Sequence, residues 1–152
     1  MRNEIVLYRG ESSRQSHKAL FALADSCYIP LGHDIIGDIF SAAGEGITKL
    51  HILAGWEEML KVALWSSARP THAEVFSLMK RASVDDAELA PFRDADINDI
   101  FPSLYYGKRF DILRKVCHAA KAKAEAKISK KNLLVYCHLA SEDVSRIVAS
   151  NL

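Results

Sequence analysis

The segment LGHDIIGD, residues 31–38, places an imidazole beside a carboxylate immediately before an apolar run. His33 and Asp34 both carry side chains that bind divalent metal ions. A metal held by several such ligands lowers the pKa of a bound water to about 7 and so supplies hydroxide as a nucleophile. Asp34 is equally well placed to begin a helix, because an aspartate at the N-cap accepts a hydrogen bond from a free backbone amide. A metal site and an ordinary helix start are therefore the two alternatives.

The His-Asp pair resembles the motif of metal-dependent phosphohydrolases of the HD class. That resemblance implies a divalent metal cofactor held by His33 and Asp34, a further histidine upstream and an aspartate well downstream. His17 would be the upstream histidine, although it lies closer to the pair than that family usually places it. The downstream ligand would be one of three aspartates, Asp94, Asp96 or Asp99.

A second short segment, VLYRGES at residues 6–12, resembles the strand that carries the first arginine of arginine-type ADP-ribosyltransferases. The resemblance implies that Arg9 holds a nicotinamide dinucleotide. Those enzymes also need a Ser-Thr-Ser strand and a Glu-x-Glu loop, and the sequence contains neither. We therefore expect Arg9 and Gly10 to turn the chain out of an edge strand.

The remaining cysteines and histidines show no motif of a known catalytic or metal site. Cys27, Cys117 and Cys137 are far apart, which indicates reduced and mostly buried thiols. The six histidines include no pair at i, i+4 and no HExxH, and the GxSxG, GxxxxGK[ST] and GxGxxG motifs are absent. We expect His118 to be solvated and His138 to be hydrogen-bonded within its apolar run. No cofactor is expected, with a divalent metal as the alternative.

Length and composition predict one globular domain over residues 1–152. The chain has 152 residues, of which 49% are hydrophobic and 26% charged, and single cores are commonest at about 100 to 150 residues. No apolar run approaches the ~20 residues that span a bilayer. Met1 is followed by polar residues and not by the apolar core of a signal peptide. We expect a cytoplasmic protein without membrane contact.

Apolar periodicity predicts a mainly α-helical bundle of about six helices. The helices are expected from Ser12 or Ser13 to before Pro30, and at 35–43, 47–67, 70–81, 108–128 and from Ser141 onwards, with a break at 44–46. Residues 5–8 are rich in β-branched and aromatic side chains, which favours a short edge strand. Residues 132–140 are ambiguous between strand and buried helix. A two-stranded pair of residues 5–8 with 133–137 is therefore possible.

Charge is segregated along the chain although the formal net charge is only +1. Residues 83–101 hold six acidic side chains against one arginine, and residues 107–131 hold nine basic side chains against two acids. Aromatic residues follow the acidic ones, and a mixture of this kind is typical of protein interfaces. The predicted binding residues are Asp94, Asp96, Asp99, Phe101, Tyr105, Tyr106, Arg114, Lys115 and Lys121.

These patterns predict a small cytoplasmic interaction module, of the regulator, immunity-protein or inhibitor type, that acts by binding and not by turnover. A protein partner is expected, and assembly with further copies of the same chain is a second possibility. Two alternatives stay open. The first is an HD-type phosphohydrolase centred on His33 and Asp34, and the second is nucleic-acid binding through the basic helix 108–131, since clustered lysines and arginines contact phosphates regardless of sequence.

Overall fold

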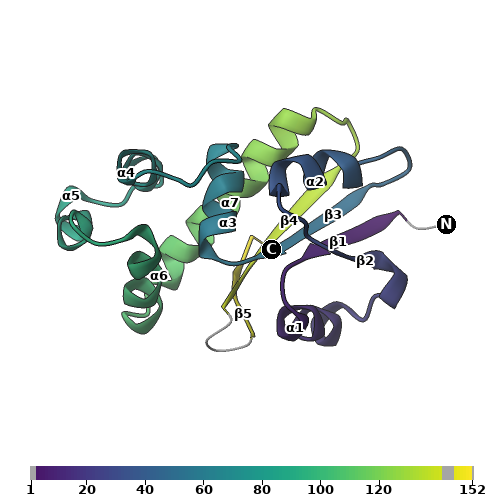
Figure 1. The fold of residues 1–152 in the computed structure, drawn as a ribbon, viewed down its shortest axis with the longest axis horizontal. Coiled ribbons are helices and arrows are strands. Elements are labelled where there is room, and N and C mark those ends of the chain that lie inside the picture. Colours follow the sequence, from purple (N-terminus) through teal and green to yellow (C-terminus); the bar gives the residue numbers. More distant parts are fainter. Residues whose placement is uncertain (1–2, 142–145, 152) are drawn as a thin grey trace.

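In the part of the chain that the structure describes, strands and helices alternate up to Leu64, four further helices follow, and two strands come last (Figure 1). The computed structural model describes residues 3–141 and 146–151. The strands are Glu4–Tyr8 (β1), Tyr28–Pro30 (β2), Lys49–Ala54 (β3), Leu134–Ser141 (β4) and Arg146–Ser150 (β5). The helices are Glu11–Phe21 (α1), Ile35–Ala42 (α2), Trp56–Leu64 (α3), His72–Arg81 (α4), Asp86–Leu89 (α5), Ile97–Tyr106 (α6) and Phe110–Ile128 (α7), with 3-10 turns at Asp25–Cys27 (η1) and Ala90–Phe92 (η2).

The described strands form one mixed sheet in the order β2-β1-β3-β4-β5. β1 pairs in parallel with β2 and β3, β3 pairs in parallel with β4, and β5 runs antiparallel to β4. The protein is thus an α/β fold, and the prediction of a mainly α-helical bundle is wrong. The predicted pairing of residues 5–8 with 133–137 is also wrong, because β3 lies between those two segments.

The misassigned segment is the long apolar stretch 47–67, which was predicted as a single helix. Residues Lys49–Ala54 form β3, Gly55 ends the strand, and α3 begins at Trp56. β3 is buried on both sides, with Leu50, Ile52 and Leu53 fully inaccessible. A parallel strand covered on both faces reads as a continuous apolar run and does not alternate. Such a run followed directly by a helix looks like one longer helix.

Two other predictions near the chain ends are corrected. β1 is an internal strand and not an edge strand, because β2 pairs with its other side. Ser141 is the last residue of β4, and residues 146–150 are strand β5 where a helix was expected. Residues 142–145 of that predicted helix lie outside the described residues.

Apolar periodicity predicted correctly three of the helices that do not directly follow a buried strand. Residues 35–42, 72–81 and 110–128 are helical, and the chain leaves the helix at 44–46 as predicted. α4 carries a full capping box, in which Thr71 and Glu74 each accept a hydrogen bond from the other's backbone amide. None of the helices in the described ranges combines the length and the apolar composition that a bilayer-crossing helix needs.

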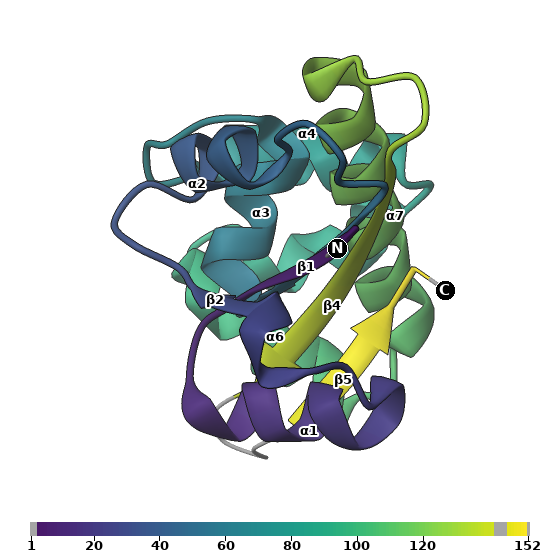
Figure 2. The same ribbon diagram turned by 90° about the vertical axis from the view of Figure 1, so that its right-hand side faces the viewer.

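The two faces of the sheet are covered very differently (Figure 2). α2, α3 and α7 lie on one face, where they enclose the main apolar core, and α1 lies on the opposite face. A smaller apolar cluster on the α1 side contains Val6, Tyr28, Leu53 and Ala140. The three cysteines are buried and free, as predicted. Most of the apolar core therefore lies on one side of the sheet.

Substitution of Ile52 tests the assignment of β3 as a central strand. Ile52→Ala should lower the free energy of unfolding by about 2–5 kcal/mol, because Ile52 is fully buried and its truncation leaves a cavity. Ile29→Ala is the matched control, since Ile29 lies on edge strand β2 and is 38% exposed. Denaturant unfolding measures both. Equal losses for the two variants would contradict this sheet order.

Candidate metal centre

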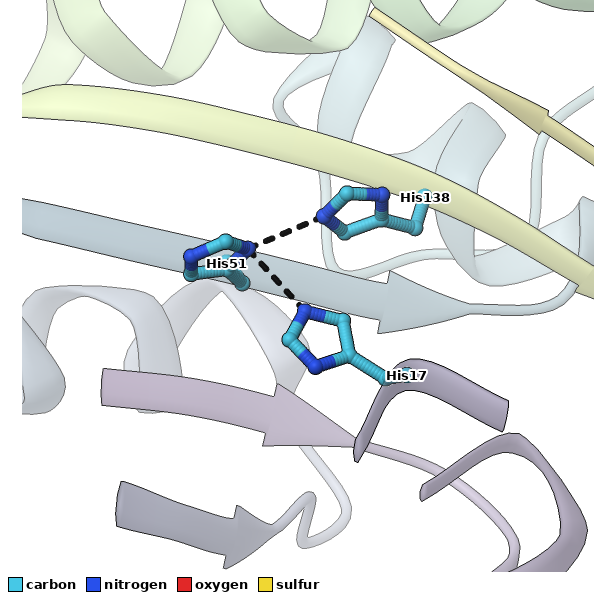
Figure 3. Close-up of side chains that lie close together, drawn as sticks. All are labelled: His17, His51 and His138. Atoms are coloured by element: carbon cyan, nitrogen blue, oxygen red, sulfur yellow. Dashed lines mark hydrogen bonds between the residues drawn. The ribbon is translucent and has the colours of Figure 1, made fainter. Parts of the chain in front are cut away.

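Three histidines from distant parts of the sequence converge between α1 and the sheet (Figure 3). His17 comes from α1, His51 from β3 and His138 from β4. Their side chains point toward one another, and their exposed fractions are 0%, 2% and 0%. Among the described residues they are the one group of His, Cys, Asp or Glu side chains whose ligand atoms all lie within 4.8 Å of one another.

The register of the sheet brings the two strand histidines together. His51 lies opposite Tyr136 of β4, and His138 lies opposite Leu53 of β3, so the two histidines are diagonal neighbours on one face. Alternate residues of a strand point to the same face, which is why β3 presents His51 toward α1 while Leu50 and Ile52 point toward the main core. His17 then closes the cluster from the helix above this face.

The nitrogens that face the centre are close to one another. His51 Nδ1 lies 3.1 Å from His17 Nε2 and 2.9 Å from His138 Nε2. The rings of His51 and His138 are nearly parallel, with an interplanar angle of 12°, and the ring of His17 stands almost perpendicular to His51 at 87°. Three ring nitrogens therefore surround one small volume.

The outward nitrogen of each ring has an oxygen partner. His51 Nε2 is 2.6 Å from Glu4 Oε2, His17 Nδ1 is 2.7 Å from the Tyr28 hydroxyl, and His138 Nδ1 is 2.7 Å from Ser150 Oγ. Glu4 lies on β1, Tyr28 on β2 and Ser150 on β5, directly opposite His138. Each of the five strands thus contributes one residue to the cluster or to its hydrogen bonds.

These partners determine where the protons lie. A carboxylate only accepts hydrogen bonds, so His51 Nε2 donates to Glu4 and the single lone pair of neutral His51 is on Nδ1. That one lone pair has two imidazole neighbours. When His17 and His138 donate from Nδ1 to their hydroxyl partners, all three lone pairs point at the same centre. A cation at the centre satisfies all three at once.

The donor set and its spacing fit a transition-metal ion. Imidazole nitrogen suits zinc, copper, iron and nickel, and Zn–N bonds of about 2.0–2.1 Å separate two tetrahedral nitrogens by about 3.4 Å. The nitrogens at 2.9 and 3.1 Å would need to move apart by only a few tenths of an ångström. Phe21 stacks on His17 at 4.4 Å and lies 5.2 Å from His51, so an apolar ring covers one side of the centre.

Burial keeps these imidazoles neutral at physiological pH. Desolvation, reinforced by the neighbouring His51, lowers the pKa of His17 to about 4. Desolvation, reinforced by His51 and His17, lowers the pKa of His138 to about 3. The pKa of His51 is also lowered by burial, although the hydrogen bond to Glu4 opposes the shift. Neutral imidazole is the form that binds metals, so an ion can enter without a net loss of protons from the three rings: a proton on a central nitrogen moves to the outward nitrogen of the same ring.

The predicted pair His33 and Asp34 lies elsewhere. Both side chains are exposed, and Asp34 is the N-cap residue of α2. Its carboxylate accepts a hydrogen bond from Ser67 Oγ at 2.7 Å, which lowers the pKa of Asp34. The described residues bring no third ligand to this pair. The HD-type site stays a prediction without support from them.

The predicted acidic and aromatic residues are placed around α6. Asp94, Asp96 and Asp99 are exposed. Asp96 caps α6 by accepting a hydrogen bond from the Asn98 amide, which lowers the pKa of Asp96, and it also pairs with Arg69.

The predicted aromatic residues form the inner side and the end of the same helix. Phe101 packs between Trp56 and Tyr105, and Tyr106 is 70% exposed. The Tyr105 hydroxyl accepts a hydrogen bond from Arg146 of β5. The predicted acidic and aromatic residues thus lie on or next to one helix. The aspartates and Tyr106 are exposed to a partner, whereas Phe101 and Tyr105 are partly buried.

The predicted basic residues lie along α7. Arg114 and Lys115 are exposed, whereas Lys121 is half-buried, pairs with Glu125 and donates a hydrogen bond to the carbonyl of Val135. Lys115 is one of the residues that line an open groove of about 680 Å³ between α3, α4 and α7. No residue of α6 lines this groove.

Sequence analysis missed the histidine cluster, although it named His17 as a possible ligand and His138 as hydrogen-bonded. The partners are separated by 34 and 87 positions, so no local motif could reveal them. The available signal was the placement of His51 and His138 inside apolar runs, where an imidazole needs a partner. Comparisons with models of protein families, with curated proteins and with solved structures found no match.

The buried histidines should make the metal-free protein sensitive to mild acid. The unfolded chain takes up protons below pH 6.5, while folded His17 and His138 stay neutral to about pH 4 and pH 3. Stability should therefore fall as pH decreases from 6.5, by about 2 kcal/mol per histidine at pH 5. Denaturant unfolding of chelator-treated protein at pH 7.5 and 5 measures this. His118→Ala, at an exposed position, should keep the slope, and equal stability at both pH values would contradict the assignment.

Proposed function

We propose that the protein binds one transition-metal ion, with zinc as the first choice, through His17 Nε2, His51 Nδ1 and His138 Nε2. The observation that carries this proposal is that the two nitrogens of each imidazole ring have different partners. One nitrogen of each faces the common centre, and the other has an oxygen partner. Metal-bound histidines almost always donate the second N–H to a carboxylate, a carbonyl or water in this way.

The ion's role is to hold α1 on the sheet. The buried side chains of α1 are Ser13 and His17, both polar, and Phe21 is only partly buried. A helix with so little buried apolar surface gains little from the hydrophobic effect. Bonds from His17 to an ion shared with β3 and β4 would supply the attachment directly. The described residues supply three ligands, so a tetrahedral ion would take a water molecule as the fourth. We favour a structural role because the three histidines are inaccessible and covered by Phe21, which leaves no room for a substrate.

The chemistry that the ion requires is present in the chain. Three neutral imidazoles contribute no charge, and Glu4 places one negative charge next to His51. This carboxylate increases the basicity of His51 and partly balances a divalent ion. Glu4 is therefore a positioning residue that does not itself contact the metal.

Metal analysis of the purified protein tests the proposal. Untagged protein prepared without chelator, incubated with Zn²⁺ and desalted should retain about one ion per chain, and the thermal midpoint should rise with zinc concentration. His51→Ala should retain none. His33→Ala is the control and should retain the ion, because His33 is exposed and distant from the cluster. Retention in His51→Ala, or loss in His33→Ala, would overturn the assignment.

A milder variant separates loss of the ligand set from loss of the fold. Glu4→Gln leaves the three histidines in place but replaces the charged acceptor of His51 Nε2. Its zinc affinity should fall by about 10- to 100-fold while its circular dichroism stays unchanged. An unchanged affinity would show that Glu4 has no part in the site.

A second candidate function follows from the groove between α3, α4 and α7. Five of its lining residues are alanines, Ala63, Ala82, Ala119, Ala122 and Ala126. Its charged lining residues are Arg81, Lys115 and Lys123, and no acidic residue of the described ranges lines it. A groove lined by alanines and basic side chains fits an acidic helix of a partner protein. The small alanine side chains permit a close approach of the two helices, and the opposite charges direct association. This proposal retains an interaction role for the basic helix.

A designed helical peptide rich in Glu and Ala is the probe for this groove. Lys115→Glu combined with Lys123→Glu should weaken its binding at least tenfold, and added salt should weaken binding to the unmodified protein. Lys127→Glu is the matched control on the same helix, since Lys127 is exposed and does not line the groove. Fluorescence anisotropy measures both. Tighter binding of a short DNA duplex than of the peptide would instead favour the nucleic-acid alternative.

A further inference from the structure

A second cavity lies at the carboxyl ends of the parallel strands. It has a volume of about 360 Å³, and its lining includes Arg9 just after β1, Gly55 just after β3 and Ser141 at the end of β4. The chain leaves β1 through α1 toward β2 on one side and reaches β3 on the other side through α2, and these helices lie on opposite faces of the sheet. Ligands of open α/β sheets bind at this kind of switch point.

We propose that this cavity binds a small phosphorylated molecule of about mononucleotide size. Binding pockets for small molecules span about 300–1,000 Å³, and this cavity is near the lower limit. The proposal does not depend on the metal site, although both involve α1. It rests on three features of the cavity: a serine hydroxyl that opens into it, two helix N-termini and an aromatic wall.

Ser13 provides the first feature. It is the third residue of α1, it is only 3% exposed, and it lines the cavity. Its hydroxyl makes no hydrogen bond to another described residue. No inaccessible side-chain oxygen or nitrogen of the described residues lacks a partner, so the Ser13 hydroxyl oxygen is the part of this side chain that stays open to the cavity and can bond a ligand there. A phosphate oxygen would satisfy it.

The helix ends provide the second feature. α1 and α3 both begin beside the cavity, both have glycine as the N-cap residue, and neither has a side-chain cap. The first backbone bonds run from Arg14 to Gly10 and from Met59 to Gly55, so the preceding amides have no intrahelical partner. Amides at a helix N-terminus bind phosphate readily. Arg9 and Glu58, the charged side chains of the lining, pair with each other. Glu11 and Glu57 also lie in the first turns of the two helices, so a phosphate would be held by the amides and not by a net positive charge.

Trp56 and Phe101 provide the third feature. Their rings line the cavity with centroids 6.0 Å apart, and Trp56 is held in place because its Nε1 donates to the carbonyl of Ile97 at 2.8 Å. Asn98, which also lines the cavity, carries an amide that can donate and accept. A fixed aromatic wall next to an amide suits a planar ring with polar edges. The ligand class is therefore a phosphate linked to such a ring.

Titration with AMP, inorganic phosphate and adenosine tests this proposal by NMR on isotope-labelled protein as purified. AMP should shift the amide signals of residues 10–13 and 55–58 and bind more tightly than either of its parts. Ser13→Ala should weaken AMP binding about tenfold, the loss expected for one hydrogen bond to a charged group. Ser12→Ala is the matched control, because Ser12 is exposed and does not line the cavity.

Each other outcome would overturn the proposal. Adenosine binding as tightly as AMP would exclude recognition of the phosphate, and phosphate binding as tightly as AMP would exclude recognition of the ring. An unchanged affinity in Ser13→Ala, or the absence of shifts at millimolar AMP, would exclude this cavity as the site. Zinc content should be the same in Ser13→Ala and Ser12→Ala, so that failure here stays distinct from failure of the metal proposal.

Discussion

A neutral imidazole has one proton and one lone pair, and in His51 the carboxylate of Glu4 decides which nitrogen carries which. Because Nε2 donates to Glu4, the lone pair on Nδ1 points into the space between His17 and His138. The neighbouring strands thereby build an electron-rich centre into one face of the sheet. His17 joins α1 to this centre, through a hydrogen bond in this structure and through a metal ion under our proposal.

The attachment of α1 follows from this constraint. On the other face, α3 and α7 bury many apolar side chains against the sheet, whereas α1 buries Ser13 and His17. Ion pairs from Arg14 and Lys18 to Asp25 add little, because exposed pairs typically contribute below about 1 kcal/mol. The same helix supplies Ser13 to the cavity one turn away from His17. Ser13 and His17 lie four positions apart on α1, so this one helix contributes to both proposed sites.

The sequence was sufficient for isolated helices and insufficient for the sheet. α4 has a capping box at Thr71 and α7 has a regular apolar arc, so local rules describe them well. The strand β3 was not predicted because its burial on both faces removes the alternation of polar and apolar residues that marks a strand. In addition, only one glycine separates it from α3, so the two elements look like one helix. Strand order depends on pairings between distant segments, which periodicity does not record. The histidine cluster could not be predicted for the same reason, because His51 and His138 come together only when β3 and β4 are adjacent.

Stability alone does not account for the composition of the α1 side of the sheet. Glu4, Tyr28, His51, His138 and Ser150 occupy positions that apolar side chains could fill. Replacing hydrogen-bonded buried groups by apolar groups of the same shape is often neutral or stabilising, whereas removing one partner alone is costly. A hydrogen-bonded network of this kind therefore adds little to the free energy of unfolding compared with apolar side chains, which suggests a role other than stability. Under the metal proposal the centre has such a role in binding an ion, and an ion bound by His17, His51 and His138 would link α1 to the sheet.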